Sequence, residues 1–416
     1  MVNYQQVKDI ESVHGCPFYL FDRQAFLRNY DQITSAFKSR YEKFILAYSY
    51  KTNYIPYLCN IIREKGSFAE VVSRLEYDLA LSIGQHPSKI IFNGPVKHYK
   101  DIELALSNDS IVNLDSWYEV THVTRYAETY PGKQVKIGIR INIGLSDAAG
   151  QSHIQQSLKV GRFGFAPDAE NITKLLSGLT ANKNVTITSL HGHTSTTDRS
   201  IWCYEVITRT LCDIASAYLP ETIEHINIGG GIYGYMPPEM SRGPVPSFDD
   251  YAAAVTDILK SYQWAQGKNP YLVLEPGVSM TANTLSFVTK VIGLKQIQNK
   301  LFVTVDGSAF NTKPTFHKFN HPFEIIKSRP TQQTATYNVV GSTCMEKDYL
   351  LTEVTGAEVQ EGDYIKINNV GAYTLVLTPP FINSAPAIVV EDAGTYKAVR
   401  TRQLLEQMFC NYCFNK

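Results

Sequence analysis

The stretch "FILAYSYKTNY", Phe44–Tyr54, places a lysine directly after a run of apolar and small residues. A run of this kind predicts a strand that is buried on both faces, as in a parallel sheet. Burying an ammonium group is costly, so most lysines at strand ends keep their charge in solvent. Lys51 therefore raises the question of whether a buried strand holds it in place for chemistry.

Seven further runs of the same kind follow, separated by amphipathic segments such as "IPYLCNIIREKG". They are "SFAEVVS", "KIIFNGP", "SIVNLDS", "VKIGIRIN", "TITSLHGHT", "HINIGGG" and "YLVLEPG". Parallel strands need long crossover connections, which are usually helices. Eight apolar strands that alternate with helices predict an α/β fold with a (β/α)8 TIM-like barrel over residues 25–280.

After Pro276 the chain changes to short runs with turn signals and no long helical periodicity, including "LFVTVDGS" and "DYIKINNVGAY". Closely spaced strands of this kind predict an antiparallel β domain over residues 281–416. We expect the run "PFYLFD" to add a strand from residues 1–24 to that domain.

The composition favours a small molecule or another protein chain as partner. The 416 residues contain 39 basic and 39 acidic side chains, which gives no electrostatic reason to expect nucleic acid or membrane. No secretory signal and no run of about 18 apolar residues occurs, so we expect a cytoplasmic protein.

Seven cysteines argue against a disulfide framework. Cys410 and Cys413 form a lone CxxC pair, and no metal is expected because a structural zinc site needs four ligands.

Polar residues gather where the predicted strands end, which is where catalytic side chains of such barrels lie. They are Lys51, Glu70, Ser73, Glu76, Arg140, Asn142, His191, His193, Gly229, Gly230, Gly231 and Glu275. Taken singly, each of them has an ordinary structural interpretation. The three glycines form a flexible turn, or they let backbone N–H groups approach a phosphate. A lysine, a phosphate site and an acid around one barrel mouth suggest pyridoxal 5'-phosphate, with the lysine forming an imine.

Several motifs in register resemble the fold-type III pyridoxal-phosphate decarboxylases, the group of diaminopimelate and ornithine decarboxylases. The segment "YSYKTN" is similar to the family's YAxKAN, "EVVSRLE" to DVVSxxE, and "HGHTST" to HxHxGS. The segments "RFGF", "IGGG", "EPG", "GSTCMEKD" and "GAY" follow in the family's order. The match covers almost the whole chain.

The resemblance implies a role for each matching residue. Lys51 would carry the cofactor, His193 would stack on its ring, and Glu275 would pair with its pyridine nitrogen. The remaining implied cofactor-binding residues are Glu70, Arg140, Ser195, Gly229, Gly230, Gly231, Gly277 and Tyr373.

The resemblance also implies a homodimer with shared active sites. Cys344 and Tyr373, from the C-terminal domain, would enter the partner subunit's site. Cys344 would protonate the carbanion left by loss of CO2 and, with Lys51 and His193, would form the catalytic set.

Departures from the family bear on the substrate. Val278 stands where the family's EPGR has arginine, and backbone amides near Gly277 or near Ser195 and Thr196 are the expected substitutes. Lys313 and His317 stand where diaminopimelate decarboxylases have arginine and tyrosine, and Met345 replaces a neighbour that binds the distal amine.

The segment "HKFNHPFEI" resembles decarboxylases of siderophore biosynthesis, and it adds His321 to the candidate substrate residues Lys313, His317 and Met345. We therefore expect decarboxylation of a non-standard amino acid or an amino-acid conjugate in a specialised pathway. Two alternatives stay open at this point. One is an amino-acid racemase or epimerase that uses Lys51 and Cys344 as opposed acid–base groups, and the other is a non-catalytic pyridoxal-phosphate protein.

Overall fold

The computed structural model describes residues 2–155, 158–240 and 243–413. The chain divides into two compact units. One consists of Tyr30–Gly234 and Val245–Ser279, and we call it the barrel unit. The other consists of Met1–Asn29, Tyr235–Pro244 and Met280–Lys416, and we call it the β unit.

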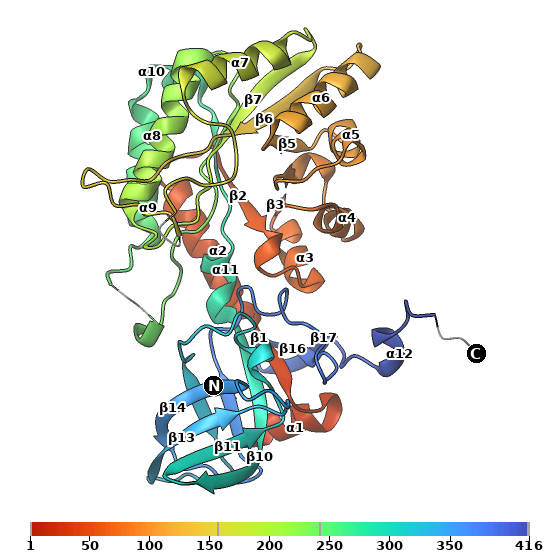
Figure 1. The fold of residues 1–416 in the computed structure, drawn as a ribbon, viewed down its shortest axis with the longest axis vertical. Helices are drawn as coiled ribbons and strands as arrows, with labels where there is room; N and C mark the ends of the chain where they lie inside the picture. Colours follow the sequence, from red (N-terminus) through yellow and green to blue (C-terminus); the bar gives the residue numbers. More distant parts are fainter. Residues whose placement is uncertain (1, 156–157, 241–242, 414–416) are drawn as a thin grey trace. The chain divides into compact units, whose positions relative to one another are not determined.

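The barrel unit contains a closed barrel of eight parallel strands, as predicted (Figure 1). The strands are β2 (Phe44–Ser49), β3 (Phe68–Val71), β4 (Ile90–Phe92), β5 (Ile111–Leu114), β6 (Val135–Arg140), β7 (Val185–His191), β8 (His225–Asn227) and β9 (Tyr271–Leu274). Pairing of β2 with β9 closes the barrel, with Phe44 opposite Leu272. Every residue of β2 is buried, as expected of a strand covered on both faces.

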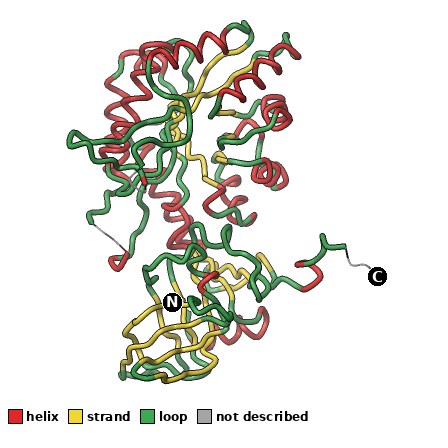
Figure 2. Tube along the Cα trace, in the orientation of Figure 1, coloured by secondary structure: helices red, strands yellow, loops and turns green. Residues whose placement is uncertain are grey.

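Helices cover the outside of these strands, and Figure 2 shows them in red around the yellow barrel. They are α2 (Arg23–Lys38), which begins in the β unit, α3 (Pro56–Glu64), α4 (Arg74–Ser82), α5 (Tyr99–Ser107), α6 (Trp117–Thr129), α7 (Ala169–Thr180), α8 (Ile201–Tyr218), α9 (Phe248–Ser261) and α10 (Gln263–Lys268). Local sequence explains their starts. Pro56 opens α3, where its missing N–H costs nothing, and Ser247 and Asp250 form a capping box at α9.

The β unit is built on a nine-stranded sheet in the order β14-β13-β11-β10-β1-β16-β17, with β15 also paired to β10 and β12 paired to β15. Its strands are β1 (Phe18–Asp22), β10 (Leu285–Ile297), β11 (Lys300–Val305), β12 (Phe323–Ile326), β13 (Thr334–Val340), β14 (Tyr349–Ala357), β15 (Tyr364–Ile367), β16 (Ala387–Asp392) and β17 (Thr395–Arg400). Three further helices are α1 (Tyr4–His14), α11 (Val278–Thr281, which starts in the barrel unit) and α12 (Leu405–Met408). Side chains from β1, β10 and β16, including Phe18, Val288 and Val389, pack with Val7 and Ile10 of α1 in one core.

The sheet is mostly antiparallel, but two of its pairs are parallel, which the sequence did not predict. Strand β1 pairs antiparallel with β10 and parallel with β16, and β11 pairs parallel with β13. Neither parallel pair is joined by a hairpin, so no turn signal fixes the relative direction of the strands.

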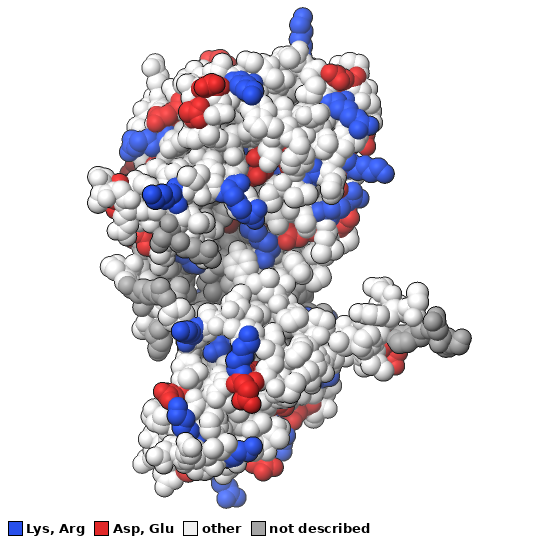
Figure 3. All heavy atoms as spheres, viewed as in Figure 1, with Lys and Arg blue, Asp and Glu red and all other residues white. Residues whose placement is uncertain are grey.

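Charged side chains of both signs are interspersed over the face shown in Figure 3, in keeping with their equal numbers. Among the described residues, no helix is both long enough and apolar enough to cross a membrane.

A glycine substitution tests the packing of the loops at the carboxyl end of the barrel. Gly94 has φ +91°, and a Cβ placed on it would lie 2.3 Å from the carbonyl oxygen of Val72. We expect Gly94→Ala to lower the free energy of unfolding by about 1–3 kcal/mol, because backbone cannot move aside as a side chain can. The matched control is Gly178→Ala, in the interior of α7 with open space around it, which should raise stability by about 0.5–1 kcal/mol. Equal effects of the two substitutions in urea unfolding would contradict this packing.

Candidate functional site

Lys51 lies just beyond its strand, in a 3-10 turn of Tyr50–Thr52 that follows β2. Strand β2 ends at Ser49, so Lys51 lies two residues beyond the end of the strand. The Lys51 side chain is 30% exposed, and its Nζ lies 2.5 Å from Oε2 of Glu70, which is buried on β3. The Ser49 hydroxyl donates to the same oxygen at 2.7 Å. The charge of Lys51 is thus paired with a buried carboxylate.

Asn93, directly after β4, connects Glu70 to a second buried carboxylate. Its Nδ2 donates to Oε1 of Glu70 at 3.0 Å and to Oε1 of Glu275 at 2.8 Å. Asn113 of β5 donates to Oδ1 of Asn93 at 2.8 Å and fixes its orientation. A continuous hydrogen-bond network therefore runs from Lys51 through Glu70 and Asn93 to Glu275.

Glu275 follows β9 and has almost no solvent contact. Asn227 donates to its Oε1 at 2.6 Å, and Nε2 of His191 lies 3.4 Å from its Oε2. Burial alone raises the pKa of this carboxyl, but His191, Lys51 and the Asn227 hydrogen bond outweigh that effect and hold the pKa well below its usual range. Both ring nitrogens of His191 lack a hydrogen-bond partner among the described residues. The His191–Glu275 contact is therefore an ion-pair distance without hydrogen-bond geometry, and Glu275 is a carboxylate held ionised.

His193 lies beside the three glycines that follow β8. The N–H of Gly230 donates to Nδ1 of His193 at 3.2 Å. Burial, together with the charges of Arg140 and Lys51, lowers the pKa of His193 to about 3, so the ring is neutral at physiological pH. A Cβ on Gly230 would lie 2.0 Å from the carbonyl oxygen of Glu275, so this close approach requires glycine.

Arg140 ends β6 and is buried against an acid that the sequence analysis did not select, Asp115. Its Nη1 lies 3.3 Å from Oδ1 of Asp115, and its Nη2 donates to the carbonyl oxygen of His193 at 2.9 Å. Burial lowers the pKa of the guanidinium, while Asp115 and Glu275 act in the opposite direction. Arg140 thus positions the backbone of the segment that carries His193.

The other predicted residues of the barrel unit serve local structure or lie at its surface. Glu76 accepts from the Val72 N–H at 2.8 Å, and burial raises its pKa to about 7. Ser73 caps α4. Asn142 donates to the carbonyl oxygens of Gly161 and Phe163.

Gly277 approaches the turn that carries Lys51 so closely that a Cβ would lie 2.0 Å from Oγ1 of Thr52. Ser195 is exposed and Thr196 is half-buried, both in the loop after β7.

Cys344, Met345 and Tyr373 belong to the β unit. Cys344 is exposed, Met345 is half-buried, and Tyr373 is exposed with φ +56°. Asp348 fixes the segment that carries the thiol, because its carboxylate accepts from the N–H and hydroxyl of Thr343 at 3.1 and 2.5 Å. The same carboxylate accepts from the N–H of Ala309 at 2.7 Å. The thiol therefore stands on a rigid, exposed loop.

Lys313, His317 and His321 form a basic cluster in the β unit. The two imidazole rings lie 5.2 Å apart, and Lys313 and His321 are buried. Burial lowers the pKa of all three groups, that of His321 to about 4. Nδ1 of His317 and both ring nitrogens of His321 have no hydrogen-bond partner among the described residues. The cluster therefore holds polar atoms that a ligand can satisfy.

The sequence analysis missed the asparagines and the aspartate that organise the barrel mouth. They are Asn93, Asn113, Asp115 and Asn227. All four lie on or just after an apolar strand, which was the same signal that selected Lys51 and Glu275. Asparagine at a strand end also marks a turn, so the pattern alone did not separate the two roles.

The barrel mouth fits pyridoxal 5'-phosphate on the nature of its groups. It offers an amine on Lys51, a buried carboxylate on Glu275 for a protonated ring nitrogen, and a glycine turn without side chains for a phosphate. Residues that could hold the cofactor are thus present in one unit.

The comparisons with known proteins agree with this interpretation. Residues 27–282 match the family described as "Pyridoxal-dependent decarboxylase, pyridoxal binding domain". Diaminopimelate decarboxylase of Helicobacter pylori is 29% identical over 423 residues, which cover 98% of each chain. A probable chloroplastic diaminopimelate decarboxylase of Oryza sativa is 27% identical over 92% of this chain and 77% of the rice protein.

Solved structures share the fold. The diaminopimelate decarboxylase of M. jannaschii in complex with L-lysine has a TM-score of 0.87 at 23% identity, covering 98% of this chain and 94% of that one. The lysine/ornithine decarboxylase of Vibrio vulnificus with putrescine has a TM-score of 0.74 at 18% identity, covering 94% and 98%.

The depressed pKa of His193 predicts a pH dependence of stability. Below its ordinary value of 6.5 the histidine takes up a proton in the unfolded chain, whereas the folded protein takes it up only near pH 3. Stability from the neutral ring is therefore complete above pH 6.5 and is lost as the pH falls towards 3. Between pH 6 and 4, cofactor-free wild type should lose up to about 1.4 kcal/mol per pH unit more than His193→Gln, measured by urea unfolding at each pH. Parallel curves for the two proteins would show that His193 is not buried in its neutral form.

Proposed function

The chain belongs to the family of pyridoxal-dependent decarboxylases, and on that premise we propose that it removes the α-carboxyl group of a non-standard amino acid or an amino-acid conjugate. Membership of the family confirms the predicted cofactor, pyridoxal 5'-phosphate, and the predicted class of enzyme, an amino-acid decarboxylase. The observation that carries the site assignment is the buried network from Lys51 to Glu275.

When bound, pyridoxal 5'-phosphate supplies a conjugated ring that accepts the electron pair released when the bond from Cα to the carboxylate breaks. Glu275 favours a proton on the ring nitrogen, because its carboxylate stays ionised and its Oε1 is held by Asn93 and Asn227. A protonated nitrogen strengthens the electron demand of the ring.

Lys51 is the amine that binds the cofactor. Its Nζ sits against Glu70, which accepts hydrogen bonds from Ser49 and Asn93 as well, so the position of the amine is fixed by three strands. Glu76, with its pKa raised to about 7, adds a second carboxyl group whose charge acts on Lys51. Glu70 orients the amine by direct contact, whereas Glu76 acts on it only through its charge.

His193 presents a neutral ring beside the glycine turn. Its Nδ1 accepts the Gly230 N–H, which fixes the orientation of the imidazole. A neutral ring can stack on a pyridine that carries a proton without adding a further positive charge. This favours His193 as the residue that covers one face of the cofactor.

The exposed thiol of Cys344 supports a homodimer with shared active sites. Cys344 and Tyr373 are both exposed in the single chain, although polar and reactive groups of this kind act in protected sites. Asp348 holds the loop of Cys344 rigid. A rigid loop suits a thiol that acts in the site of another subunit. We assign Cys344 as the proton donor to Cα in the partner's site.

The substrate assignment rests on Val278 and on the basic cluster of the β unit. An arginine is always charged and binds a carboxylate through two parallel hydrogen bonds, which lysine and histidine cannot copy. Lys313 and His317 with lowered pKa values therefore form a poorer site for a bare carboxylate than an arginine does. We infer a substrate whose distal part is larger and hydrogen-bonded, with Met345 contacting its apolar portion.

Diaminopimelate is the second candidate substrate, because several relatives are named diaminopimelate decarboxylases. A single screen separates the two. Conjugates that exceed diaminopimelate as substrates would support the proposal, and turnover of meso-diaminopimelate alone would replace it with the second candidate.

The reaction itself is tested by measuring CO2 release and exchange of the Cα proton for deuterium on the same substrate. We expect CO2 release by wild type, none by Lys51→Ala because no amine remains to bind the cofactor, and normal release by Lys38→Ala, an exposed lysine on α2. Exchange without CO2 release would instead identify a racemase or epimerase. Cofactor binding with neither reaction on any substrate of the screen would leave the non-catalytic alternative.

The shared site is tested by mixing two inactive variants. Lys51→Ala lacks the amine and Cys344→Ala lacks the thiol, so a mixed dimer contains one site with both groups. Random exchange at equal amounts should restore about 25% of wild-type activity, since half of the dimers are mixed and half of their sites are intact. No recovery, in a mixture shown by native mass spectrometry to have exchanged subunits, would refute the shared site.

A further inference from the structure

The loop between β7 and α8 carries an arginine, Arg199, with one buried nitrogen, Nη1, that lacks a hydrogen-bond partner among the described residues. A buried donor without an acceptor is unfavourable, and native proteins satisfy such groups with protein, water or ligand. The orphaned guanidinium N–H therefore points to a group outside the chain.

Two tyrosines contact Arg199, and one of them packs on a third tyrosine that reaches the glycine turn after β8. Its carbonyl oxygen accepts from the Tyr251 hydroxyl at 2.5 Å, and its guanidinium carbon lies 5.1 Å from the ring centre of Tyr233. The rings of Tyr251 and Tyr204 pack at 5.1 Å, and the Tyr204 hydroxyl donates to the carbonyl oxygen of Gly230 at 3.0 Å. The arginine and the glycine turn are thus parts of one packed cluster.

The glycine turn by itself offers few free donors. The N–H of Gly229 donates to Oδ1 of Asn227 at 2.9 Å, and that of Gly230 donates to His193. Among the described residues, only Gly231 of the three has an amide without a hydrogen bond in this structure. A phosphate dianion bound here needs a positive charge as well, because charge-assisted hydrogen bonds supply most of the strength of such sites. Position 278, where the resembling family has an arginine, carries a valine and supplies none.

The other cations of the barrel mouth are already paired with acids. Lys51 is paired with Glu70, and Arg140 with Asp115. His193 is neutral because its pKa lies near 3. Arg199 is the cation near the turn for which the described part of the chain shows no acidic partner.

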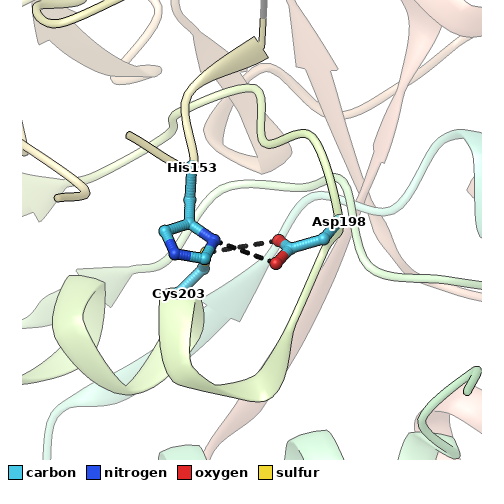
Figure 4. Close-up of side chains that lie close together, drawn as sticks. All are labelled: His153, Asp198 and Cys203. Carbon is cyan, nitrogen blue, oxygen red and sulfur yellow. Dashed lines mark hydrogen bonds and ion pairs between the residues drawn. The ribbon is translucent and has the colours of Figure 1, made fainter. Parts of the chain in front are cut away.

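The acid adjacent to Arg199 in sequence is committed elsewhere. Oδ2 of Asp198 lies 2.9 Å from Nδ1 of His153, and its Oδ1 accepts from the Ser200 N–H at 3.2 Å and lies 3.8 Å from Sγ of Cys203. Figure 4 shows the side chains of His153, Asp198 and Cys203 close together. Nε2 of the same histidine lies 3.4 Å from Oδ2 of Asp147. Asp198 is thus held by His153 and Ser200, and among the described residues it forms no ion pair with Arg199.

The backbone of Arg199 is in the left-handed region, with φ +49°, which residues other than glycine seldom adopt. The Thr196 hydroxyl accepts its N–H at 3.1 Å and holds this conformation. Strained backbone of this kind is kept where it serves a site. The 18-residue helix α8 begins two residues later, so its positive amino-terminal end lies in the same place.

We propose that Arg199 is the cation that binds the phosphate group of pyridoxal 5'-phosphate in this protein, in place of an arginine at position 278. This inference rests on the proposed function, since it concerns the same cofactor site. Nη1 of Arg199 would donate to a phosphate oxygen, and the amide of Gly231 would donate to the same group. The loop after β7 thereby supplies the charge that the loop after β9 lacks.

Cofactor affinity, measured without reference to catalysis, tests the proposal. Cofactor-free protein is titrated with pyridoxal 5'-phosphate and with pyridoxal, which has no phosphate, and absorbance of the bound aldehyde is followed. Arg199→Gln should bind pyridoxal 5'-phosphate about 10- to 100-fold more weakly than wild type and should bind pyridoxal unchanged. Arg199→Lys should recover most of the loss because it keeps the charge. Arg209→Gln, an exposed arginine farther along α8, is the matched control and should bind both as wild type does.

Two outcomes would overturn the proposal while leaving the function intact. One is unchanged affinity of Arg199→Gln for pyridoxal 5'-phosphate, and the other is equal loss of affinity for both aldehydes, which indicates a structural role. Wild type that binds neither aldehyde would instead refute the proposed function.

A measurement on wild type covers the case in which Arg199→Gln does not fold. Inorganic phosphate should slow the modification of Arg199 by phenylglyoxal, with no effect on Arg209, as read by peptide mass spectrometry. Modification of Arg199 at the same rate with and without phosphate would overturn the proposal.

Discussion

A carboxylate buried at the mouth of the barrel, that of Glu275, is the constraint on which the site depends. An unpaired buried charge is expensive, so the surrounding strands must each supply a donor or a charge. Asn227 from β8 and Asn93 after β4 do so by hydrogen bonds, and His191 from β7 lies at ion-pair distance. These strands are distant in sequence and meet only because the barrel closes. Asn93 also donates to Glu70, and Glu70 in turn holds the amine of Lys51 in position.

The extent of what the sequence could predict follows from the range of the forces involved. The eight strands could be located because each is a local apolar run, and Lys51 and Glu275 because each closely follows such a run. Asn93 and Asn113 could not, because their role depends on contacts across strands that no local pattern records. The parallel pairing of β1 with β16 escaped prediction for a similar reason, since no turn joins the two strands.

Burial raises the pKa of an acid and lowers the pKa of a base, and the two units differ in whether neighbouring groups counteract it. In the barrel unit, neighbouring donors and cations overcome burial and keep Glu275 charged, while His193 loses its charge. In the β unit, burial lowers the pKa of Lys313 and of His321, and no acid among the described residues acts to raise it. A site built from such groups has a charge state that an anionic or hydrogen-bonding ligand can change. Its selectivity then depends on the ligand more strongly than that of an arginine, which is charged in either state.

The position of a cation within the barrel mouth also matters for Lys51. Gly277 packs directly on the turn that carries this lysine, so a charged side chain at position 278 would stand one residue away from that contact. Arg199 approaches from the loop after β7, where it is held by Tyr251 and Tyr233 rather than by the Lys51 turn. Placing the cation on that loop separates the charge that binds phosphate from the pair of Lys51 and Glu70, and the two can then be tuned independently.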